Sequence, residues 1–281
     1  MSFFDGARSL LKWRMARAMI LPAANYLACK QGRGVRGLFY DQGVWIHETD
    51  QGYFAYPHPY IRLNLGDFDA FTRTVFFRAY LPEDGDVIVD VGAGAGEETL
   101  TFSRAVGDRG RVISVEAHPR TFRCLEKLVQ YNRLKNVVPV HRAISQPACR
   151  VLRIEDSSRY LGNRTSASSG LAVTATTLDE LMEELQVHRI NFLKMNIEGA
   201  ERSAILGMTR TLERTETVCI CCHDFLADAS HDDKLRTRNA VTQFLQEHGF
   251  NLIHQADEGL PPYVRDQVWA SNPRLALSTA G

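Results

Sequence analysis

A short apolar strand that runs directly into closely spaced glycines constrains the fold of this chain more than any other feature. Residues 86–91 read Asp-Val-Ile-Val-Asp-Val, and glycines follow at 92, 94 and 96 before a helix-forming segment. Glycine lets the backbone turn tightly and lets a ligand approach the main chain, and helix N-terminal N–H groups can bind a carboxylate. A dinucleotide fingerprint needs its third glycine at position 97, which is Glu97 here. The pattern D-x-G-x-G-x-G is instead typical of S-adenosylmethionine (SAM) binding.

An acidic residue ends the next predicted strand. Residues 111–116 finish at Glu116, roughly 20 residues past the glycines, where a carboxylate binds the ribose of such a cofactor. A carboxylate can accept hydrogen bonds from both ribose hydroxyls. The alternative is a glycine-rich turn without a ligand, but the position of Glu116 favours a cofactor site. We predict that SAM contacts Asp90, Gly92, Ala93, Gly94, Gly96, Glu97, Thr99, Glu116, Ala117, Arg142 and Ala143.

Length, charge and composition limit the number of domains and the kinds of partner that this protein can have. The 281 residues suit one α/β domain with an N-terminal extension better than two full domains. Lys and Arg together number 33, as do Asp and Glu, so the formal net charge is zero and a nucleic-acid partner is disfavoured. The six cysteines have no disulfide-framework spacing, which indicates reduced thiols in a cytoplasmic protein. No apolar run is long enough to cross a bilayer.

Strands and helices alternate from about residue 65 onward. Such alternation requires crossover connections and predicts a mainly parallel, Rossmann-like sheet covered on both faces. The last two strands, Phe250 to His254 and Gln267 to Ser271, have no helix predicted between them. This ending suits the seven-stranded sheet of class I methyltransferases, with one antiparallel strand. The other predicted strands lie near 86–91, 111–116, 137–141, 190–196 and 217–222, and the helices near 97–106, 119–134, 177–187, 200–213 and 232–248.

Residues 1–64 are predicted to form an extension to a methyltransferase domain at 65–281. Loosely helical spacing of apolar and basic residues predicts a helix from about Phe3 to Lys30, and a β-hairpin should follow at 44–56. The helix could pack on its own domain, form a homodimer or rest on a membrane surface. Its irregular apolar stripe favours packing within the chain or between subunits.

Three further segments carry expectations. Asp67 is expected to cap a helix that continues to Tyr80. Residues 156–170 are polar and rich in Gly and Ser, which predicts a lid loop. In the N-terminal hairpin region, His47 and His58 could line a lid or lie exposed, and the sequence does not decide between these two possibilities.

Four segments together resemble the FkbM family of SAM-dependent methyltransferases. They are residues 89–96, 115–119, 176–181 and 193–201. The last two, which precede the Val-Cys-Ile-Cys-Cys-His strand, are more specific than the glycine loop. The resemblance covers roughly 65–271 and implies methyl transfer from SAM to a small hydroxylated or glycosylated acceptor. In this family the acceptor is usually a hydroxyl of a sugar, a glycolipid or a polyketide-like metabolite.

The chain departs from the family pattern at two positions. Asn196 stands where the family typically has Asp, and Cys221 stands where Glu is common. Both changes remove a carboxylate at the edge of the sheet where ligands bind in such folds. Mg²⁺ prefers hard oxygen ligands, so we expect metal-independent transfer and predict no metal site. An inactive member or one of altered specificity is also consistent with these changes.

The predicted catalytic residues gather around the same sheet edge. His223 is the first candidate for a general base, because imidazole titrates near neutrality. Lys194 could orient the acceptor or stabilise its developing charge, Asn196 could hydrogen-bond it, and Glu198 begins the following turn. Structural alternatives exist: Glu198 could act only at a helix N-terminus, and Lys194 could pair with Glu198 or Glu201.

Two other functional interpretations, a zinc site and an amine-methylation signature, are disfavoured by the sequence. A zinc site at Cys219, Cys221, Cys222 and His223 has the wrong spacing, and a strand points successive thiols to opposite faces, so we expect buried thiols. The Leu260-Pro261-Pro262-Tyr263 segment lacks the polar first residue of an amine-methylation signature and predicts a proline turn. The leading hypothesis is therefore an O-methyltransferase. An N-methyltransferase and a non-catalytic SAM-binding protein are the alternatives.

Overall fold

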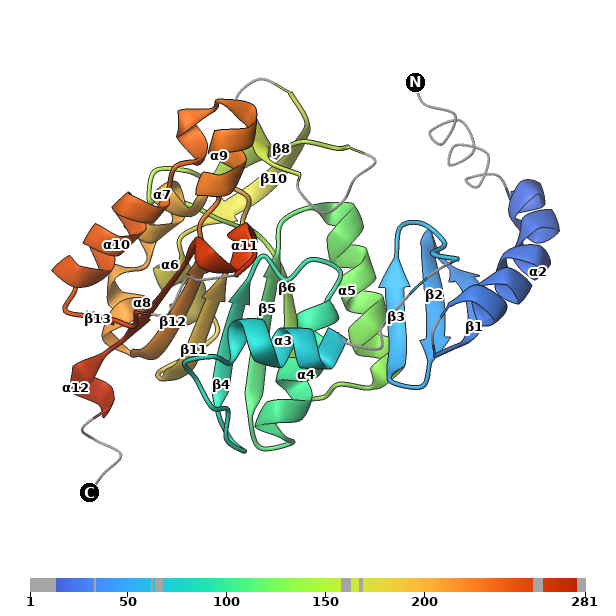
Figure 1. Ribbon diagram of the computed structural model, residues 1–281, viewed down its shortest axis with the longest axis horizontal. Helices are drawn as coiled ribbons and strands as arrows, with labels where there is room; N and C mark the ends of the chain where they lie inside the picture. Colours follow the sequence, from blue (N-terminus) through green and yellow to red (C-terminus); the bar gives the residue numbers. More distant parts are fainter. Residues whose placement is uncertain are drawn as a thin grey trace.

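The core of the protein is a seven-stranded sheet in the order β13-β14-β12-β11-β4-β5-β6 (Figure 1). Its strands are β4 (Val87–Val91), β5 (Arg111–Glu116), β6 (Val137–His141), β11 (Ile190–Met195), β12 (Thr215–Cys221), β13 (Asn251–Leu252) and β14 (Gln267–Ser271). Only β14 runs antiparallel to its neighbours. The class I methyltransferase sheet predicted from the sequence is thus confirmed. The computed structural model describes residues 14–32, 34–61, 63, 68–157, 163–166, 169–254 and 260–276.

Helices cover both faces of this sheet because successive strand residues point to opposite sides. Ile88 and Phe192 pack beneath α3 and α4, whereas Val89 and Leu193 pack on the side of α6, α8 and α10. Cys221 and Cys222 are likewise buried in opposite layers, as expected for thiols on a strand. These helices are α3 (Phe68–Phe76), α4 (Glu97–Val106), α6 (Leu178–Glu184), α8 (Thr209–Glu213) and α10 (Arg238–Glu247). A further helix, α5, spans Pro119–Asn132.

Several elements differ from the sequence-based expectation. The single helix expected at 200–213 is divided into α7 (Glu201–Ala204), a 3₁₀ turn and α8, and the turn ends at Gly207, which lies against the backbone of Ser145. The helix expected at 232–248 starts later, because the Asp224 carboxylate accepts hydrogen bonds from the first amides of α10. Asp224 itself begins an unpredicted helix, α9 (Asp224–Ser230).

The connection between β13 and β14 also contains a helix that was not predicted. α11 (Pro262–Arg265) has proline in its first turn, a position where the missing N–H costs nothing. A proline turn without a helix was therefore the wrong expectation for this segment. The C-terminal α12 (Pro273–Ala276) follows β14. The helix expected to start at Asp67 is α3, which ends at Phe76, and Asp67 itself lies outside the described residues.

A second sheet, absent from the prediction, follows β6 in the chain. Its four strands have the order β7-β10-β8-β9. Part of the expected lid loop at 156–170 belongs to it, because β9 pairs with β8. In β10, buried Val173 and Ala175 alternate with more exposed neighbours, a pattern typical of a half-buried strand. These strands are β7 (Ala143–Ile144), β8 (Val151–Ile154), β9 (Thr165–Ser166) and β10 (Leu171–Thr176).

The N-terminal region forms a third sheet beside α5 (Figure 1). The predicted hairpin is present as β2 (Val44–Thr49) and β3 (Gly52–Tyr56), and β1 (Val35–Asp41) extends it. The Asn132 side chain of α5 joins this sheet to the main domain: it accepts a hydrogen bond from Tyr53 N at 2.9 Å and donates one to Tyr53 O at 2.6 Å. Helix α2 (Arg14–Gln31) packs on the sheet from outside.

Candidate functional site

A cavity of about 380 Å³ opens at the carboxyl ends of β4, β5 and β11. Ligands bind at this edge of parallel sheets because the connecting loops diverge there. Three parts of the chain line the cavity. The main sheet with its loops and α3 contributes Gly92, Gly94, Glu116, Asn196, Glu198 and Phe68; the N-terminal region contributes Tyr56, Tyr60 and Leu63; the second sheet contributes Ile144, Leu152, Ile154 and Thr165.

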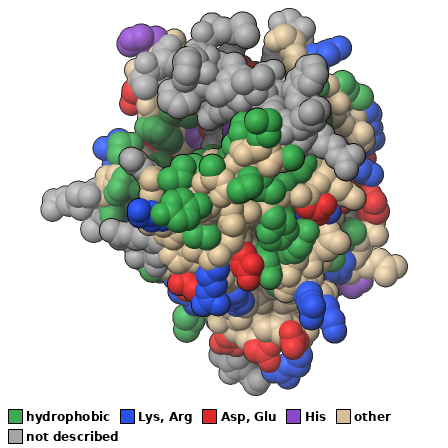
Figure 2. Space-filling model, turned by 90° about the vertical axis from the view of Figure 1, so that its right-hand side faces the viewer, with side chains coloured by type: hydrophobic (Ala, Val, Ile, Leu, Met, Phe, Trp, Pro, Cys, Tyr) green, Lys and Arg blue, Asp and Glu red, His purple; other side chains and the backbone are tan. Residues whose placement is uncertain are grey.

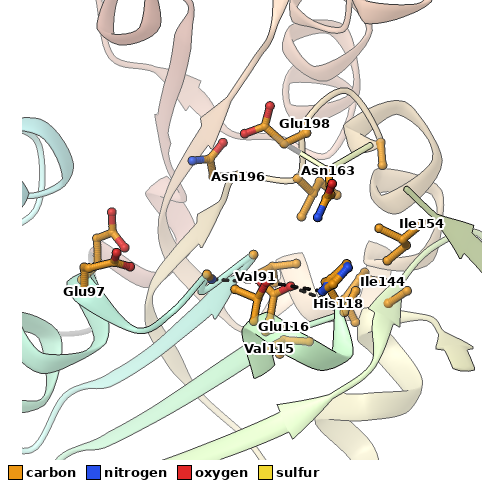
Figure 3. Close-up of a pocket in the computed structure, with 18 of the residues that line it drawn as sticks. Val91, Glu97, Val115, Glu116, His118, Ile144, Ile154, Asn163, Asn196 and Glu198 are labelled. Carbon is orange, nitrogen blue, oxygen red and sulfur yellow. Dashed lines mark hydrogen bonds between the residues drawn. The ribbon is translucent and has the colours of Figure 1, made fainter. Parts of the chain in front are cut away.

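Backbone hydrogen bonds fix Glu116 beneath the glycine loop. Its two carboxylate oxygens accept hydrogen bonds from Gly94 N at 3.0 Å and His118 N at 2.8 Å, the dashed lines of Figure 3. Burial raises the pKa of Glu116 to about 7, although these two amides oppose the shift. Gly92 has φ of +81°, and a Cβ there would lie 1.9 Å from Asn196 O, so only glycine fits.

These residues fit SAM. A Cβ at Gly94 would have only Glu97 Oε2 within 4 Å, so the loop backbone is open to a ligand. Glu116 presents an acceptor for ribose hydroxyls, and the apolar side chains of Ile144 and Ile154 form a wall for a flat base. Asn163 Nδ2 is buried without a hydrogen-bond partner among the described residues and is turned toward the cavity (Figure 3). A buried donor of this kind calls for an acceptor on a ligand.

Lys194 forms a buried ion pair under the glycine loop. Its Nζ lies 2.8 Å from Asp90 Oδ1 and donates a hydrogen bond to Gly92 O at 3.0 Å. Burial alone would lower the pKa of Lys194, but the charges of Asp90 and Glu98 raise it above its usual value. The pairing with Glu198 or Glu201 considered from the sequence is not formed. Lys194 borders the cavity, but its contacts hold the loop in place.

His223 lies between two carboxylates behind the cavity wall. Its Nδ1 is 3.0 Å from Glu201 Oε1 and its Nε2 is 3.6 Å from Glu198 Oε2. Burial lowers the pKa of His223, but hydrogen bonds and charge from the two glutamates outweigh burial and raise it to about 10. The imidazole therefore holds its proton at neutral pH. This arrangement does not fit the predicted role of general base, for which a free imidazole nitrogen is required.

The carboxylate of Glu198, by contrast, faces the cavity (Figure 3). Burial raises the pKa of Glu198, but the hydrogen bond and charge of His223 leave it below the usual value. The Glu198 backbone has a φ of +54°, which is uncommon for a residue other than glycine. Glu201 fixes this turn, since its Oε1 accepts hydrogen bonds from Ile197 N and Gly199 N. Strained backbone held by its surroundings often marks a functional site.

The predicted site residues divide into two groups. Those that line the cavity are Gly92, Gly94, Glu97, Glu116, Ala117, Arg142, Ala143, Lys194, Asn196 and Glu198. The others lie behind it. Among these, Asp90 pairs with Lys194, and Thr99 hydrogen-bonds to Ser114 at 3.0 Å between α4 and β5. Ala93 and Gly96 pack in the loop, where Gly96 lies against Leu125. Of the two positions that depart from the family pattern, Asn196 faces the cavity and Cys221 is buried in the core.

An aromatic wall was missed by the sequence analysis. Tyr56 and Tyr60 meet at a ring separation of 4.9 Å, and both line the cavity. The buried His47 accepts a hydrogen bond from Tyr60 N at 3.0 Å, and burial lowers its pKa to about 4, so it is neutral. His47 is thus neither exposed nor part of a lid. Glu98 was also missed, although it follows the predicted Glu97 directly and lines the cavity.

Similarity to known proteins places this geometry in a family. The FkbM methyltransferase domain matches residues 90–252, which is more than half of the chain. The hexuronic acid methyltransferase AglP of Haloferax volcanii is 26% identical over 145 residues, 50% of this chain and 57% of AglP. The fibrillarin-like rRNA/tRNA 2'-O-methyltransferase of Pyrobaculum neutrophilum is 44% identical over 59 residues, 21% of this chain and 25% of that protein. The chain therefore spans little more than half of the length of AglP.

Two solved structures are also similar. Aeropyrum pernix fibrillarin, solved with SAM bound, has a TM-score of 0.44 and 16% identity, with 84% of this chain and 98% of that chain covered. The FkbM methyltransferase of Methylobacillus flagellatus has a TM-score of 0.47 and 16% identity, with 71% and 47% covered. The family match and the residues that line the cavity both indicate that the cofactor is SAM. This chain belongs to the FkbM family of SAM-dependent methyltransferases.

Proposed function

We propose that the protein transfers a methyl group from SAM to a hydroxyl of an uncharged sugar or similar polyhydroxylated small molecule, without a metal. The observation that carries this proposal is the position of Asn196 and Glu198. Both face the cavity from the end of β11, on the side opposite Glu116 (Figure 3). An acceptor between them and the cofactor would have a hydrogen-bonding amide and a carboxylate beside its hydroxyl.

Each residue then has a defined task. Bound SAM supplies an electrophilic methyl group on a positively charged sulfur. Glu198 would accept the hydroxyl proton as the oxygen–methyl bond forms and the methyl–sulfur bond breaks. Asn196 would orient the acceptor, since alignment supplies much of the rate of such a displacement. His223 keeps its own proton and holds the Glu198 carboxylate in place. Tyr56 and Tyr60 offer ring faces on which a sugar can pack.

The charge of the cavity argues for an uncharged acceptor. Its lining includes four carboxylates, those of Glu97, Glu98, Glu116 and Glu198, against two cations, Arg142 and Lys194, and Lys194 is already paired with Asp90. One of these carboxylates can balance the SAM ammonium group, but an acidic acceptor would meet the rest at close range, where like charges repel strongly. The name of AglP describes an enzyme that acts on a hexuronic acid. We propose a neutral sugar here instead.

A radiolabel assay tests this proposal. After SAM binding is measured by calorimetry, the full chain is incubated with methyl-tritiated SAM and with glycosides of neutral hexoses, hexosamines and hexuronic acids. Products are then treated with mild alkali, which hydrolyses methyl esters and leaves methyl ethers intact. We expect alkali-stable label on the neutral sugars. Label on hexosamine nitrogen would favour the N-methyltransferase alternative, and alkali-labile label on hexuronic acids would contradict the charge argument.

Glu198→Gln separates catalysis from cofactor binding. Loss of a general base typically costs about 10²–10⁴ in rate, while the SAM affinity should stay within a few-fold. Glu183→Gln is the matched control, because that carboxylate pairs with Arg210 on the surface. SAM binding without transfer to any sugar, in wild type as in Glu198→Gln, would favour the non-catalytic alternative.

A further inference from the structure

Helix α2 presents apolar side chains on two sides. Its inner side, with Ala24 and Ala28, packs on the N-terminal sheet in a cluster with Trp45. Its outer side carries large apolar side chains exposed to solvent: Met19 (81% exposed), Tyr26 (62%), Ile20 (39%) and Leu27 (37%). Positions 19, 26 and 27 recur at helical spacing, so they share one face. A row of exposed apolar residues on one helix marks an interaction surface.

The charges around this outer face are basic. The segment Arg14–Gln31 contains two arginines, one lysine and no acidic residue. Lys30 Nζ lies over the Tyr26 ring at 5.7 Å from its centroid, so a cation borders the apolar row directly. Arg36 is exposed next to the end of the helix, where Cys29 Sγ donates a hydrogen bond to Arg36 O. Figure 2 views this side of the molecule and shows hydrophobic side chains gathered near the middle of the face.

Two acidic side chains of the N-terminal sheet lie against its main chain. Glu48 belongs to β2 and Asp50 to the turn after it, and their carboxylates lie against the backbone at Gly37 in β1 and at Gly34 just before β1. The outer face of α2 therefore combines apolar, aromatic and basic groups. This combination is typical of helices that lie in the interface of an anionic membrane, where the apolar side enters the acyl boundary and lysine reaches the headgroups.

Charge also decides between a lipid surface and a second copy of the chain. A two-fold dimer places the same patch on both sides of the interface, so the basic groups of α2 would face one another. An anionic bilayer instead neutralises each basic group, at about 1 kcal/mol per Lys or Arg near the surface. Among the described residues, no helix is both long and apolar enough to span a bilayer.

We propose that α2 docks the protein on an anionic lipid surface, with Met19, Ile20, Tyr26 and Leu27 in the interface and Lys30 and Arg36 at the headgroups. Leu63 connects the inner side of α2 to the cavity, because it packs in the cluster with Ala24 and Ala28 and also lines the cavity. The proposal does not depend on methyl transfer, since it concerns the outer face of α2 alone.

Vesicle sedimentation tests the proposal with the full chain. Phosphatidylcholine vesicles with and without phosphatidylglycerol are mixed with the protein and centrifuged. We expect the protein to sediment with the anionic vesicles and to be released by salt, which screens the charge attraction. Met19→Gln combined with Tyr26→Gln, and separately Lys30→Glu, should each weaken binding about tenfold. All three side chains are exposed, so these variants should fold.

Leu81→Gln is the matched control, because Leu81 is 84% exposed but lies outside α2, and its vesicle binding should equal that of wild type. Circular dichroism melting verifies that each variant is folded. Wild-type protein that stays in the supernatant with anionic vesicles would overturn the proposal. Sedimentation equally weakened by Leu81→Gln would also overturn it. So would a dimer in analytical ultracentrifugation that the α2 substitutions dissociate, since a second copy would then occupy the surface.

Discussion

At the scale of single residues, Gly92 and Gly94 look alike in sequence but make different demands on the loop. A Cβ at Gly92 would lie 1.9 Å from Asn196 O, whereas at Gly94 the nearest heavy atom would be Glu97 Oε2 at 3.7 Å. Both residues have positive φ. Gly92→Ala should therefore lower the unfolding free energy by at least about 3 kcal/mol, because the backbone at Asn196 would have to move to make room for the added methyl group. Gly94→Ala should lower the unfolding free energy by only about 1 kcal/mol, which is the cost of a positive φ angle in alanine.

Urea unfolding and SAM calorimetry measure both effects. Gly94→Ala should remain folded but bind SAM more weakly, because the added methyl group enters the space next to the cofactor. If the two variants lost equal stability, the close approach of Gly92 to Asn196 would not be what the loop requires.

The Glu116 carboxyl predicts how SAM affinity depends on pH. Its pKa of about 7 in the free protein exceeds the usual value because of burial. Ribose hydroxyls and the positive sulfonium favour the ionised form, so binding should lower this pKa and release a proton. The SAM dissociation constant should therefore rise about tenfold per pH unit below about 7 and level off above it. Calorimetry in buffers of different ionisation enthalpy counts the released protons, and Glu116→Gln should remove this dependence.

Some site residues could be predicted from sequence because their positions are local. Glu116 ends a strand at a fixed distance from the glycine loop, and it faces the cavity as expected. Lys194 could not be placed in this way. It pairs with Asp90 because β11 lies next to β4, where the two residues are register partners, and strand order is a property of the whole sheet. The proton on His223 depends likewise on two glutamates that only the folded turn brings together.

At the scale of elements, His223 ties the end of β12 to the turn between β11 and α7. Its pKa is raised from 6.5 to about 10 by Glu198 and Glu201. A group whose pKa is raised on folding stabilises the protein fully below its unfolded pKa, and this stabilisation is lost as the pH rises through the folded pKa. The window therefore runs from about pH 6.5 to 10. His223→Gln should cost up to about 4 kcal/mol at pH 6, and less as the pH approaches 10.

Urea unfolding of wild type and His223→Gln at several pH values measures this contribution together with that of its two glutamate partners, because the titrating groups away from His223 are common to both. A difference in unfolding free energy that did not change between pH 6 and 10 would show that the imidazole is not the charged partner of the two glutamates. Arg236, which pairs with Asp228 and Asp233 on the surface, provides a control. Arg236→Gln should show no comparable change over this range, since exposed pairs contribute little.

Long elements were predictable because their periodicity extends over many residues. The strands of the main sheet and helices such as α4 and α5 agree with the prediction to within a few residues. The second sheet was missed because β7 and β9 have only two residues each, too few for a period to be visible. Two helices changed for tertiary reasons: Gly207 interrupts one against Ser145, and the Asp224 carboxylate sets the start of α10.

At the scale of the whole molecule, the cavity lies between parts of the chain that are far apart in sequence. Tyr56 comes from the N-terminal sheet, Ile154 from the second sheet and Glu116 from the main sheet. The glycine loop and Glu116 belong to the main sheet, which explains why this part of the site could be predicted from short motifs. The walls come from additions to the common fold, and fold-level resemblance does not specify such additions.

Cofactor binding should therefore couple the three sheets, which hydrogen exchange can measure. At a SAM concentration of about 100 times its dissociation constant, linkage raises the unfolding free energy by about 2.7 kcal/mol. Beyond this global effect, we expect slower exchange at the backbone amides of both β3 and β8, because a ligand in the cavity contacts Tyr56 on one side and Ile154 on the other. Helix α10 contributes no residue to the cavity lining and serves as the internal control. Protection of β3 without protection of β8 would mean that the second sheet does not enclose the cofactor. Protection that persisted in Glu116→Gln at the same SAM concentration would place the cofactor away from the Glu116 carboxylate.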